Sequence, residues 1–248
     1  MPSDWLLDLG HSRAKWVLAR QGEVVDESAR SCPLDNLDRL GQDLASGQGE
    51  RLWLSAQSSP ASVSMVTSLA EQHGLSLQIV PLGAFNLPVK PAYSTLGCDR
   101  WLAMQWPWEE TRKGFCVIDC GTAVTVDIVD DQGQHQGGWI MAGLQILRKG
   151  LFAHAPGLAE LSQAGGDVTE DFLPPATDSA RAITAGTMVQ VSAALNRALL
   201  AASDLLGRFP DVWITGGDGR HVAGHLSPPP AFDALLVLRG LALATRSS

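Results

Sequence analysis

One short pattern occurs twice in this chain and restricts its fold more than any other feature. Asp8-Leu9-Gly10-His11-Ser12 and Asp119-Cys120-Gly121-Thr122-Ala123 share an aspartate, one apolar residue and a glycine, followed by small or polar residues. An apolar run precedes and follows each copy, so each predicts a β-hairpin with the aspartate near the end of its first strand. We call them the first Asp-Gly turn (Asp8–Lys15) and the second Asp-Gly turn (Asp119–Ala123).

The spacing of the two copies suggests a duplicated architecture. They are separated by about 110 residues, the length of one ordinary lobe. The chain has 248 residues, and its 45% hydrophobic and 18% charged content is enough for a sizeable core. We therefore expect two lobes, residues 1–112 and 113–248, each carrying one Asp-Gly turn.

The remaining patterns alternate between strand and helix, which favours an α/β fold. Residues 81–96 contain three prolines and little periodicity, and are expected to form a loop. Strands are expected at residues 5–9, 15–19, 23–29, 52–55, 75–80, 115–119, 122–129, 137–143 and 212–215, and helices at 33–44, 61–73, from 99, 178–206 and 233–245.

Charge and cysteine content exclude several classes of protein. A formal charge of −8 and a pI near 5.1 lack the basic footprint of a nucleic-acid binder. The four cysteines form no Cys-x-x-Cys pair, so neither a zinc site nor a disulfide framework is indicated. Residues 1–10 carry acids where a signal peptide carries bases, and no apolar run could span a bilayer, so a cytoplasmic protein without a membrane partner is expected.

The Asp-Gly turns suit phosphate chemistry. A carboxylate at a strand end offers an oxygen ligand to a metal, and the glycine lets backbone amides approach phosphate oxygens. No P-loop and no protein-kinase glycine loop is present. The segment Thr215-Gly216-Gly217-Asp218-Gly219 follows an apolar strand, and its bare backbone could accommodate a nucleoside or simply form a left-handed turn.

Five motifs together resemble the type III pantothenate kinase family. They are Asp8-x-Gly10-His11-Ser12-x-x-Lys15, Gly97-x-Asp99-Arg100, Asp119-x-Gly121-Thr122-Ala123, Gly137-Gly138-x-Ile140-x-x-Gly143 and Thr215-Gly216-Gly217. The resemblance implies duplicated actin-like (ribonuclease H-like) lobes with an interlobe cleft, and a homodimer. It also implies ATP-dependent phosphorylation of pantothenate to 4'-phosphopantothenate, the first step of coenzyme A biosynthesis, with Mg²⁺ and a monovalent cation, K⁺ or NH₄⁺.

The same resemblance assigns roles to individual residues. Asp99 resembles the catalytic base, and Asp119 the ligand of the monovalent cation. Ser179 stands where the family has a substrate-binding threonine, His11 where it has asparagine, and Met141 where it commonly has proline. The residues resembling the ATP site are Asp8, Leu9, Gly10, His11, Ser12, Arg13, Ala14, Lys15 and Thr122, and those resembling the pantothenate site are Tyr93, Gly97, Cys98, Asp99, Arg100 and Ser179.

Three alternatives stay open at this point. The acceptor could be a sugar, since hexose kinases share the superfamily. The chain could also be a nucleotide-binding regulatory protein without turnover, an accessory factor in transcription, which His11 favours. Finally, Asp99 could be an ordinary N-terminal helix cap rather than a base.

Overall fold

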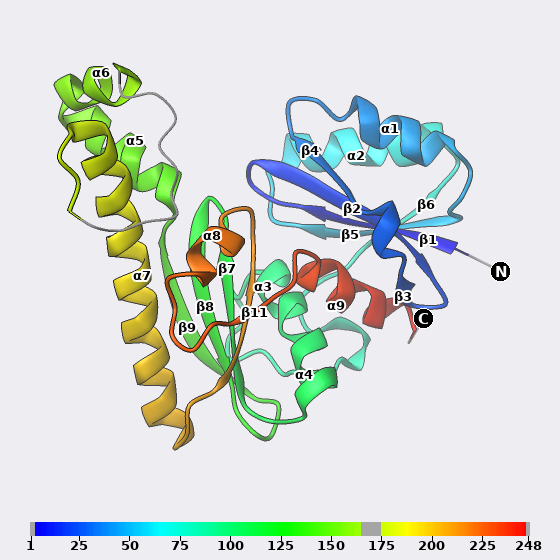
Figure 1. Cartoon of the computed structure of the whole chain (residues 1–248). Helices are drawn as coiled ribbons and strands as arrows, with labels where there is room; N and C mark the ends of the chain where they lie inside the picture. Colours follow the sequence, from blue (N-terminus) through cyan, green and yellow to red (C-terminus); the bar gives the residue numbers. More distant parts are fainter. Residues whose placement is uncertain (1–2, 165–174, 247–248) are drawn as a thin grey trace. The chain divides into compact units, whose positions relative to one another are not determined.

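The computed structural model describes residues 3–164 and 175–246 and contains two compact units (Figure 1). The first comprises residues 1–113, 131–135 and 235–248, and the second residues 114–130 and 136–234. The main change of unit, after residue 113, falls beside the expected lobe boundary at 112–113. The C-terminal segment, expected in the second lobe, packs with the first unit.

The first unit contains a mixed sheet in the order β3-β2-β1-β5-β6, with β4 beside β2. β1 is antiparallel to β2 and parallel to β5, which in turn is parallel to β6. The strands are β1 (Ser3–Leu9), β2 (Arg13–Arg20), β3 (Glu23–Val24), β4 (Arg30–Pro33), β5 (Arg51–Ala56) and β6 (Ser76–Ile79).

The sheet of the second unit repeats this topology, in the order β9-β8-β7-β10-β11. β7 is antiparallel to β8 and parallel to β10, and β10 is parallel to β11. The strands are β7 (Phe115–Cys120), β8 (Ala123–Val129), β9 (His135–Ala142), β10 (Asp211–Thr215) and β11 (Ala231–Phe232). An antiparallel hairpin followed by two parallel strands thus occurs in both units, and the predicted α/β class with two related sheets is confirmed.

Helices cover both faces of the first sheet. Helices α1 (Asp38–Ala45) and α2 (Pro60–Gln72) pack on the face that carries Leu7 and Leu54 (Figure 1). α9 (Leu236–Thr245) packs against the sheet strands and against α3 (Cys98–Ala103), which α4 (Gln105–Thr111) follows directly. A Cβ at Gly240 would lie 1.9 Å from the Leu102 carbonyl oxygen, so this glycine permits the close approach of α9 to α3.

In the second unit a long helix supports the sheet. α7 (Ser179–Leu206) matches the expected helix closely, and its apolar residues join Ile118, Val126 and Ile214 of the sheet in one core. α8 (Gly219–Ala223) contributes Val222 to the same core. Helices α5 (Leu144–His154) and α6 (Pro156–Ala164) lie between β9 and α7 in sequence.

Two expected elements differ most at their ends. The helix expected at 33–44 begins only at Asp38, because Pro33 is the last residue of β4 and pairs with Arg13 of β2. The strand expected at 23–29 ends at Val24, since residues 26–28 form a 3₁₀ turn. Pairing with β2 decided the first boundary and is invisible to local periodicity, whereas the 3₁₀ turn decided the second.

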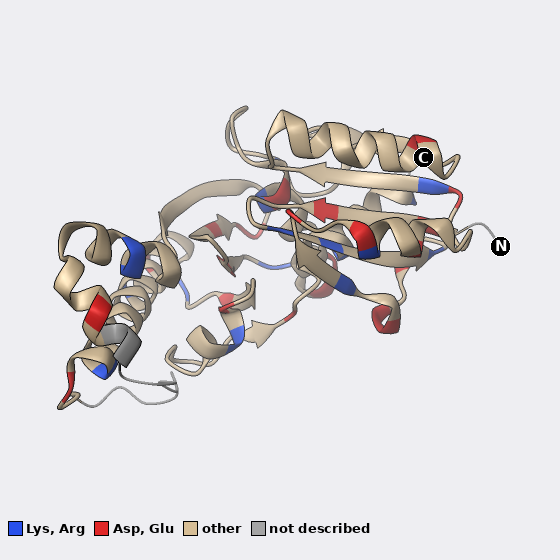
Figure 2. Ribbon diagram, turned by 90° about the horizontal axis from the view of Figure 1, so that it is seen from above, with Lys and Arg blue, Asp and Glu red and all other residues tan. Residues whose placement is uncertain are grey.

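Acidic and basic residues are interspersed along the strands and helices of each unit (Figure 2). Among the described residues, no helix is both long and apolar enough to cross a bilayer.

Candidate active site

The first Asp-Gly turn closes the β1–β2 hairpin as predicted. Asp8 is the penultimate residue of β1 and pairs with Lys15, while Leu9 pairs with Ala14. The Gly10 amide donates to the Arg13 carbonyl oxygen at 3.0 Å, which tightens the turn. His11, Ser12 and Arg13 at its tip are exposed, so the tip can be reached by a ligand.

The side chain of Asp8 lies on the face of the sheet opposite helices α1 and α2. Leu7 and Leu9 belong to the core on these helices, so the side chain of Asp8 projects from the opposite face of the sheet. Ser55 of β5 is the register partner of Asp8 and faces the same side. Its hydroxyl is fully buried and has no hydrogen-bond partner in the described part of the chain.

The second Asp-Gly turn reproduces this geometry. Asp119 is penultimate in β7 and pairs with Thr125, and the Gly121 amide donates to the Ala123 carbonyl oxygen at 3.0 Å. The neighbouring Ile118 and Cys120 belong to the core, so Asp119 also projects from the face away from it. Its register partner on the parallel strand is Thr215, a buried hydroxyl residue like Ser55.

The glycine segment after β10 lies directly against the second Asp-Gly turn. A Cβ at Gly216 would lie 2.3 Å from the Cys120 carbonyl oxygen and 2.6 Å from Asp119 Oδ1, and its φ is +93°. The Asp218 amide donates to the same Cys120 carbonyl at 3.0 Å. Asp119 and Asp218 add to the effect of burial in raising the pKa of the Cys120 thiol. A bare, tightly held backbone therefore adjoins the Asp119 carboxylate.

Further support for the second turn comes from the end of β9. The Gly143 amide donates to the Thr122 carbonyl oxygen at 3.1 Å, and a Cβ at Gly143 would lie 2.6 Å from that oxygen. Thr122 itself is exposed. Ser179 begins α7 in the same unit and is also exposed, next to the N-cap Asp178, whose carboxylate accepts the Arg181 amide at 2.9 Å.

The predicted acceptor segment forms the N-terminus of α3 in the first unit. Gly97 is the N-cap residue and Asp99 lies in the first turn, so the hypothesis that Asp99 is the helix cap is wrong. Asp99 Oδ1 accepts the Arg100 amide at 2.7 Å, and a Cβ at Gly97 would lie 2.5 Å from this oxygen. The glycine therefore leaves room for the carboxylate.

Arg100 and Tyr93, predicted together for the pantothenate site, are in contact. Arg100 is 9% exposed and its Nη1 donates to the Tyr93 hydroxyl at 3.2 Å. The Tyr93 ring lies 5.9 Å from the ring of His135, whose Nδ1 accepts the Ala92 amide at 3.4 Å. The proline-rich loop is thus fixed to α3 through its tyrosine.

Cys98 connects this segment electrostatically with the first Asp-Gly turn. Burial raises the pKa of its thiol to about 12, and the charges of Asp99 and Asp8 add to the rise. Its Sγ donates to the Val80 carbonyl oxygen at 3.1 Å. The Cys98 thiol is therefore protonated at neutral pH and packs as part of the structure. The carboxylates of Asp99 and Asp8 both lie near enough to act on it.

Sequence reasoning missed Gln57, which directly follows β5. Its amide N–H donates to the Leu9 carbonyl oxygen at 3.0 Å, which holds it at the first Asp-Gly turn. Its side-chain Oε1 lies 3.5 Å from the Cβ position at Gly97, the same point that Asp99 Oδ1 approaches. The position of Gln57 beside the turn follows from the pairing of β1 with β5, which also places Ser55 opposite Asp8. No local motif encodes this pairing, so the sequence alone could not reveal it.

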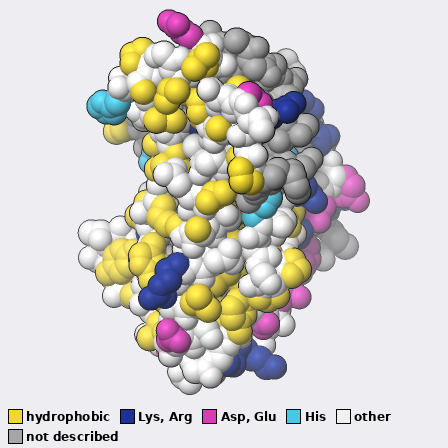
Figure 3. All heavy atoms as spheres, turned by 60° about the vertical axis from the view of Figure 1, so that its left-hand side comes forward, with side chains coloured by type: hydrophobic (Ala, Val, Ile, Leu, Met, Phe, Trp, Pro, Cys, Tyr) yellow, Lys and Arg dark blue, Asp and Glu magenta, His cyan; other side chains and the backbone are white. Residues whose placement is uncertain are grey.

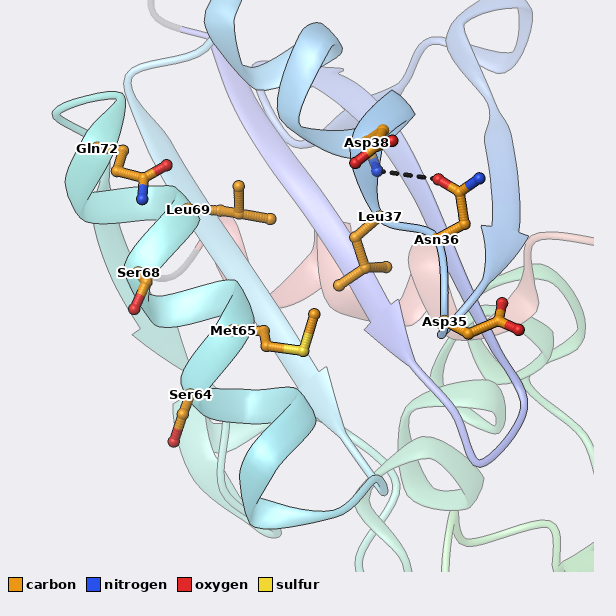
Figure 4. A pocket seen from close by; sticks show the side chains of 9 residues that line it. All are labelled: Asp35, Asn36, Leu37, Asp38, Ser64, Met65, Ser68, Leu69 and Gln72. Carbon is orange, nitrogen blue, oxygen red and sulfur yellow. Dashed lines mark hydrogen bonds between the residues drawn. The ribbon is translucent and has the colours of Figure 1, made fainter.

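A hollow in the described residues lies elsewhere, between the segment preceding α1 and helix α2 (Figure 4). Its volume is about 640 Å³, and it is an open groove with none of the predicted site residues. The Asp38 amide at its edge donates to Asn36 Oδ1 at 3.3 Å. Its lining residues are Asp35, Asn36, Leu37, Asp38, Ser64, Met65, Ser68, Leu69 and Gln72.

Metal binding by protein groups alone is not supported in the described part of the chain, which contains no cluster of three or more His, Cys, Asp or Glu side chains. Mg²⁺ usually uses one or two carboxylates and completes its shell with water and phosphate oxygens. Asp8 and Asp119, each half-buried at a strand end, fit that requirement only with a phosphate ligand present.

Comparisons with known proteins identify the family of this chain. The family model described as type III pantothenate kinase matches residues 5–200. Curated relatives include the type III pantothenate kinases of Stenotrophomonas maltophilia strain K279a (30% identity, 97% of this chain and 96% of the relative) and Azotobacter vinelandii (28%, 96% of each).

Solved structures show the same fold at low sequence identity. A conserved Baf family protein from Campylobacter jejuni aligns with a TM-score of 0.61 and 20% identity, over 98% of this chain and 97% of the other. A ROK family glucokinase from Streptomyces griseus, solved with glucose and AMPPNP, aligns with a TM-score of 0.54 and 10% identity, over 97% and 98%.

Proposed function

The chain belongs to the type III pantothenate kinase family, and from this premise we propose the role of each part of its site. The protein is a kinase that transfers the terminal phosphoryl group of ATP to pantothenate, in coenzyme A biosynthesis. The observation that carries this conclusion is the family match across residues 5–200, which includes both Asp-Gly turns and the Asp99 segment. Neither the sugar-kinase nor the regulatory alternative is favoured.

We assign the chemistry of the acceptor to Asp99. Its carboxylate takes the proton from the primary hydroxyl of pantothenate as that oxygen attacks the γ-phosphorus of ATP, and the bond from this phosphorus to the β–γ bridging oxygen breaks to release ADP. The position of Asp99 in the first turn of α3, beside Arg100 and after the loop that carries Tyr93, supports this role. Arg100, held by Tyr93, would bind the carboxylate of pantothenate.

The two Asp-Gly turns would hold ATP. In the first unit residues 11–13 and Lys15 would contact its phosphates, and in the second unit Thr122 would. A divalent cation would be held by Asp8 and phosphate oxygens, and would supply neutralisation of phosphate charge when bound. Ser179, at the start of α7, keeps the hydroxyl expected of a pantothenate contact.

We further propose that the protein is a cytoplasmic homodimer. Large apolar side chains are exposed on the second unit, among them Trp139 and Ile140 of β9 and Ile146 of α5. Hydrophobic side chains are visible at the surface in the view of Figure 3. A homodimer interface on this unit would remove these side chains from water.

A coupled assay for ADP release, run with and without pantothenate, tests the function directly. We expect turnover that requires pantothenate, and 4'-phosphopantothenate as the product in mass spectrometry. Equal ADP release with and without pantothenate would contradict the kinase assignment, and turnover with a hexose but not with pantothenate would support the sugar-kinase alternative.

The cation requirement is a separate prediction. Asp119 lies near a strand end, the charges of Asp119 and Asp218 both act on Cys120, and a bound monovalent cation would offset this negative charge near the phosphates. We expect high activity with K⁺ or NH₄⁺ and little with Na⁺ alone. In the Asp119→Asn variant the activity should no longer depend on which of these cations is present. Equal rates in the three chloride salts at matched ionic strength would refute this role of Asp119.

A further inference from the structure

The duplicated topology allows the two units to be compared strand by strand, and the comparison points to Gln57. In each unit the parallel strand beside the Asp-Gly turn places a buried hydroxyl residue in register with the aspartate, Ser55 with Asp8 and Thr215 with Asp119. The segments that follow differ. Ala56-Gln57 continues the first, whereas Gly216-Gly217-Asp218 continues the second.

The same hydrogen bond anchors both segments. The Gln57 amide donates to the carbonyl oxygen of Leu9, the last residue of β1, and the Asp218 amide donates to that of Cys120, the last residue of β7, each at 3.0 Å. The second segment has one more residue and a bare backbone, which suits the approach of a nucleoside. The first segment instead places a long polar side chain at the corresponding edge.

That side chain is directed to the acceptor segment. Gln57 Oε1 and Cδ lie 3.5 and 3.6 Å from the Cβ position at Gly97, and Asp99 Oδ1 lies 2.5 Å from the same position. The Gln57 amide and the Asp99 carboxylate therefore converge on one point at the start of α3. The hydrogen bond from the Gln57 amide to the Leu9 carbonyl oxygen holds the backbone of Gln57 at the first Asp-Gly turn.

The Gln57 amide is available for a ligand. The side chain is half-buried and forms no hydrogen bond with any residue in the described ranges 3–164 and 175–246. A primary amide both donates and accepts hydrogen bonds, so it can pair with a hydroxyl group in either direction. A partly desolvated amide of this kind binds a hydroxyl with more selectivity than a solvated one does.

We propose that Gln57 binds the acceptor beside Asp99 and selects for pantothenate through the secondary hydroxyl adjacent to the reacting arm. The proposal rests on the proposed function, because it takes pantothenate as the acceptor and Asp99 as the group at its primary hydroxyl. The two hydroxyls of pantothenate are separated by three carbons, so a group next to Asp99 meets the secondary hydroxyl first. Gln57 is then a specificity-determining contact, and Asp99 performs the proton transfer.

The test combines a variant with a substrate analogue. Gln57→Leu removes the amide at similar size, and we expect its KM for pantothenate to rise about tenfold or more while its KM for ATP changes by less than about twofold. Pantothenate lacking the secondary hydroxyl should lose about tenfold in kcat/KM with the wild-type protein and nothing further with Gln57→Leu, since the two changes delete one interaction. Gln78→Leu, on exposed β6 of the same sheet, is the control and should leave both KM values unchanged.

The outcomes separate this proposal from the function on which it rests. Calorimetric titration of pantothenate into both variants, together with their thermal midpoints, shows whether a loss reflects weaker binding or unfolding. If Gln57→Leu does not fold, Gln57→Glu replaces it, because glutamate keeps the shape of the side chain. Wild-type binding that Gln57→Leu does not weaken, or losses from variant and analogue that simply add, would overturn the role of Gln57 alone. A wild-type protein that neither binds nor phosphorylates pantothenate would overturn the proposed function, and this role with it.

Discussion

At the scale of single residues, the position of Asp99 separates a catalytic from a structural role. Its Oδ1 accepts the Arg100 amide, and Asn would keep that acceptor. Asp99→Asn should therefore remain folded but lose about 10²- to 10⁴-fold in kcat, because an amide cannot take the hydroxyl proton. The measurements are kcat with saturating pantothenate and the thermal midpoint.

Asp38→Asn provides the matched control, since Asp38 is also a first-turn aspartate, in α1. It should lower stability by about 0.3–1 kcal/mol through the helix dipole and leave kcat unchanged. If Asp99→Asn turns over within about threefold of the wild type, below any usual acid–base contribution, the base is another residue.

Cys98 gives a pH prediction at the same scale. Its folded pKa is raised to about 12 from 9.0, so the buried neutral thiol stabilises the fold fully below pH 9. That contribution is lost as the pH rises from 9 toward 12, because the unfolded chain then releases the proton first. We expect the free energy of unfolding in urea to fall less between pH 8 and 10.5 for Cys98→Ala than for the wild type. Identical falls would show that the Cys98 thiol is not buried as described.

At the scale of elements, the Thr215–Asp218 segment depends on one glycine. At Gly216 a Cβ would lie 2.3 Å from the Cys120 carbonyl oxygen, and φ is +93°, a region that alanine disfavours. Gly216→Ala should lower the free energy of unfolding by about 1–3 kcal/mol and raise the KM for ATP. Gly217 has nothing within 4 Å of its Cβ position, so Gly217→Ala should cost less than about 0.5 kcal/mol.

The measurements are the free energy of unfolding in urea and the KM for ATP of the Gly216→Ala and Gly217→Ala variants. Equal effects at both glycines would mean that the close approach of Gly216 to β7 is not required for the fold or for ATP.

At the scale of the whole molecule, the homodimer can be tested with two exposed isoleucines on edge strands. Ile140 in β9 is 67% exposed and Ile79 in β6 is 53% exposed. If the apolar surface of the second unit is covered by another copy, Ile140→Asp should shift the protein from dimer to monomer because it buries a charge. Ile79→Asp should leave the oligomeric state unchanged. Sedimentation velocity would contradict the proposal if the wild type is a monomer, or if both variants remain dimers.

The sequence determined the features that repeat locally. Apolar runs on either side of a glycine turn predicted both hairpins, and the expected helix at 178–206 matches α7, because these patterns arise from neighbours in the chain. The alternation of strand and helix patterns predicted the α/β class, and the duplicated Asp-Gly turns predicted two related lobes. The family resemblance proposed roles for residues such as Asp99 and Asp119, and these roles stay predictions until they are measured.

Only the tertiary structure decided what depends on partners distant in sequence. The start of α1 was misplaced because Pro33 pairs with β2, and the C-terminal helix was assigned to the second lobe although Gly240 packs it against Leu102 in the first unit. Gln57 was missed for the same reason. Its significance comes from the parallel pairing of β1 with β5 and from the approach of Gly97, and no local periodicity records contacts between residues that far apart in the chain.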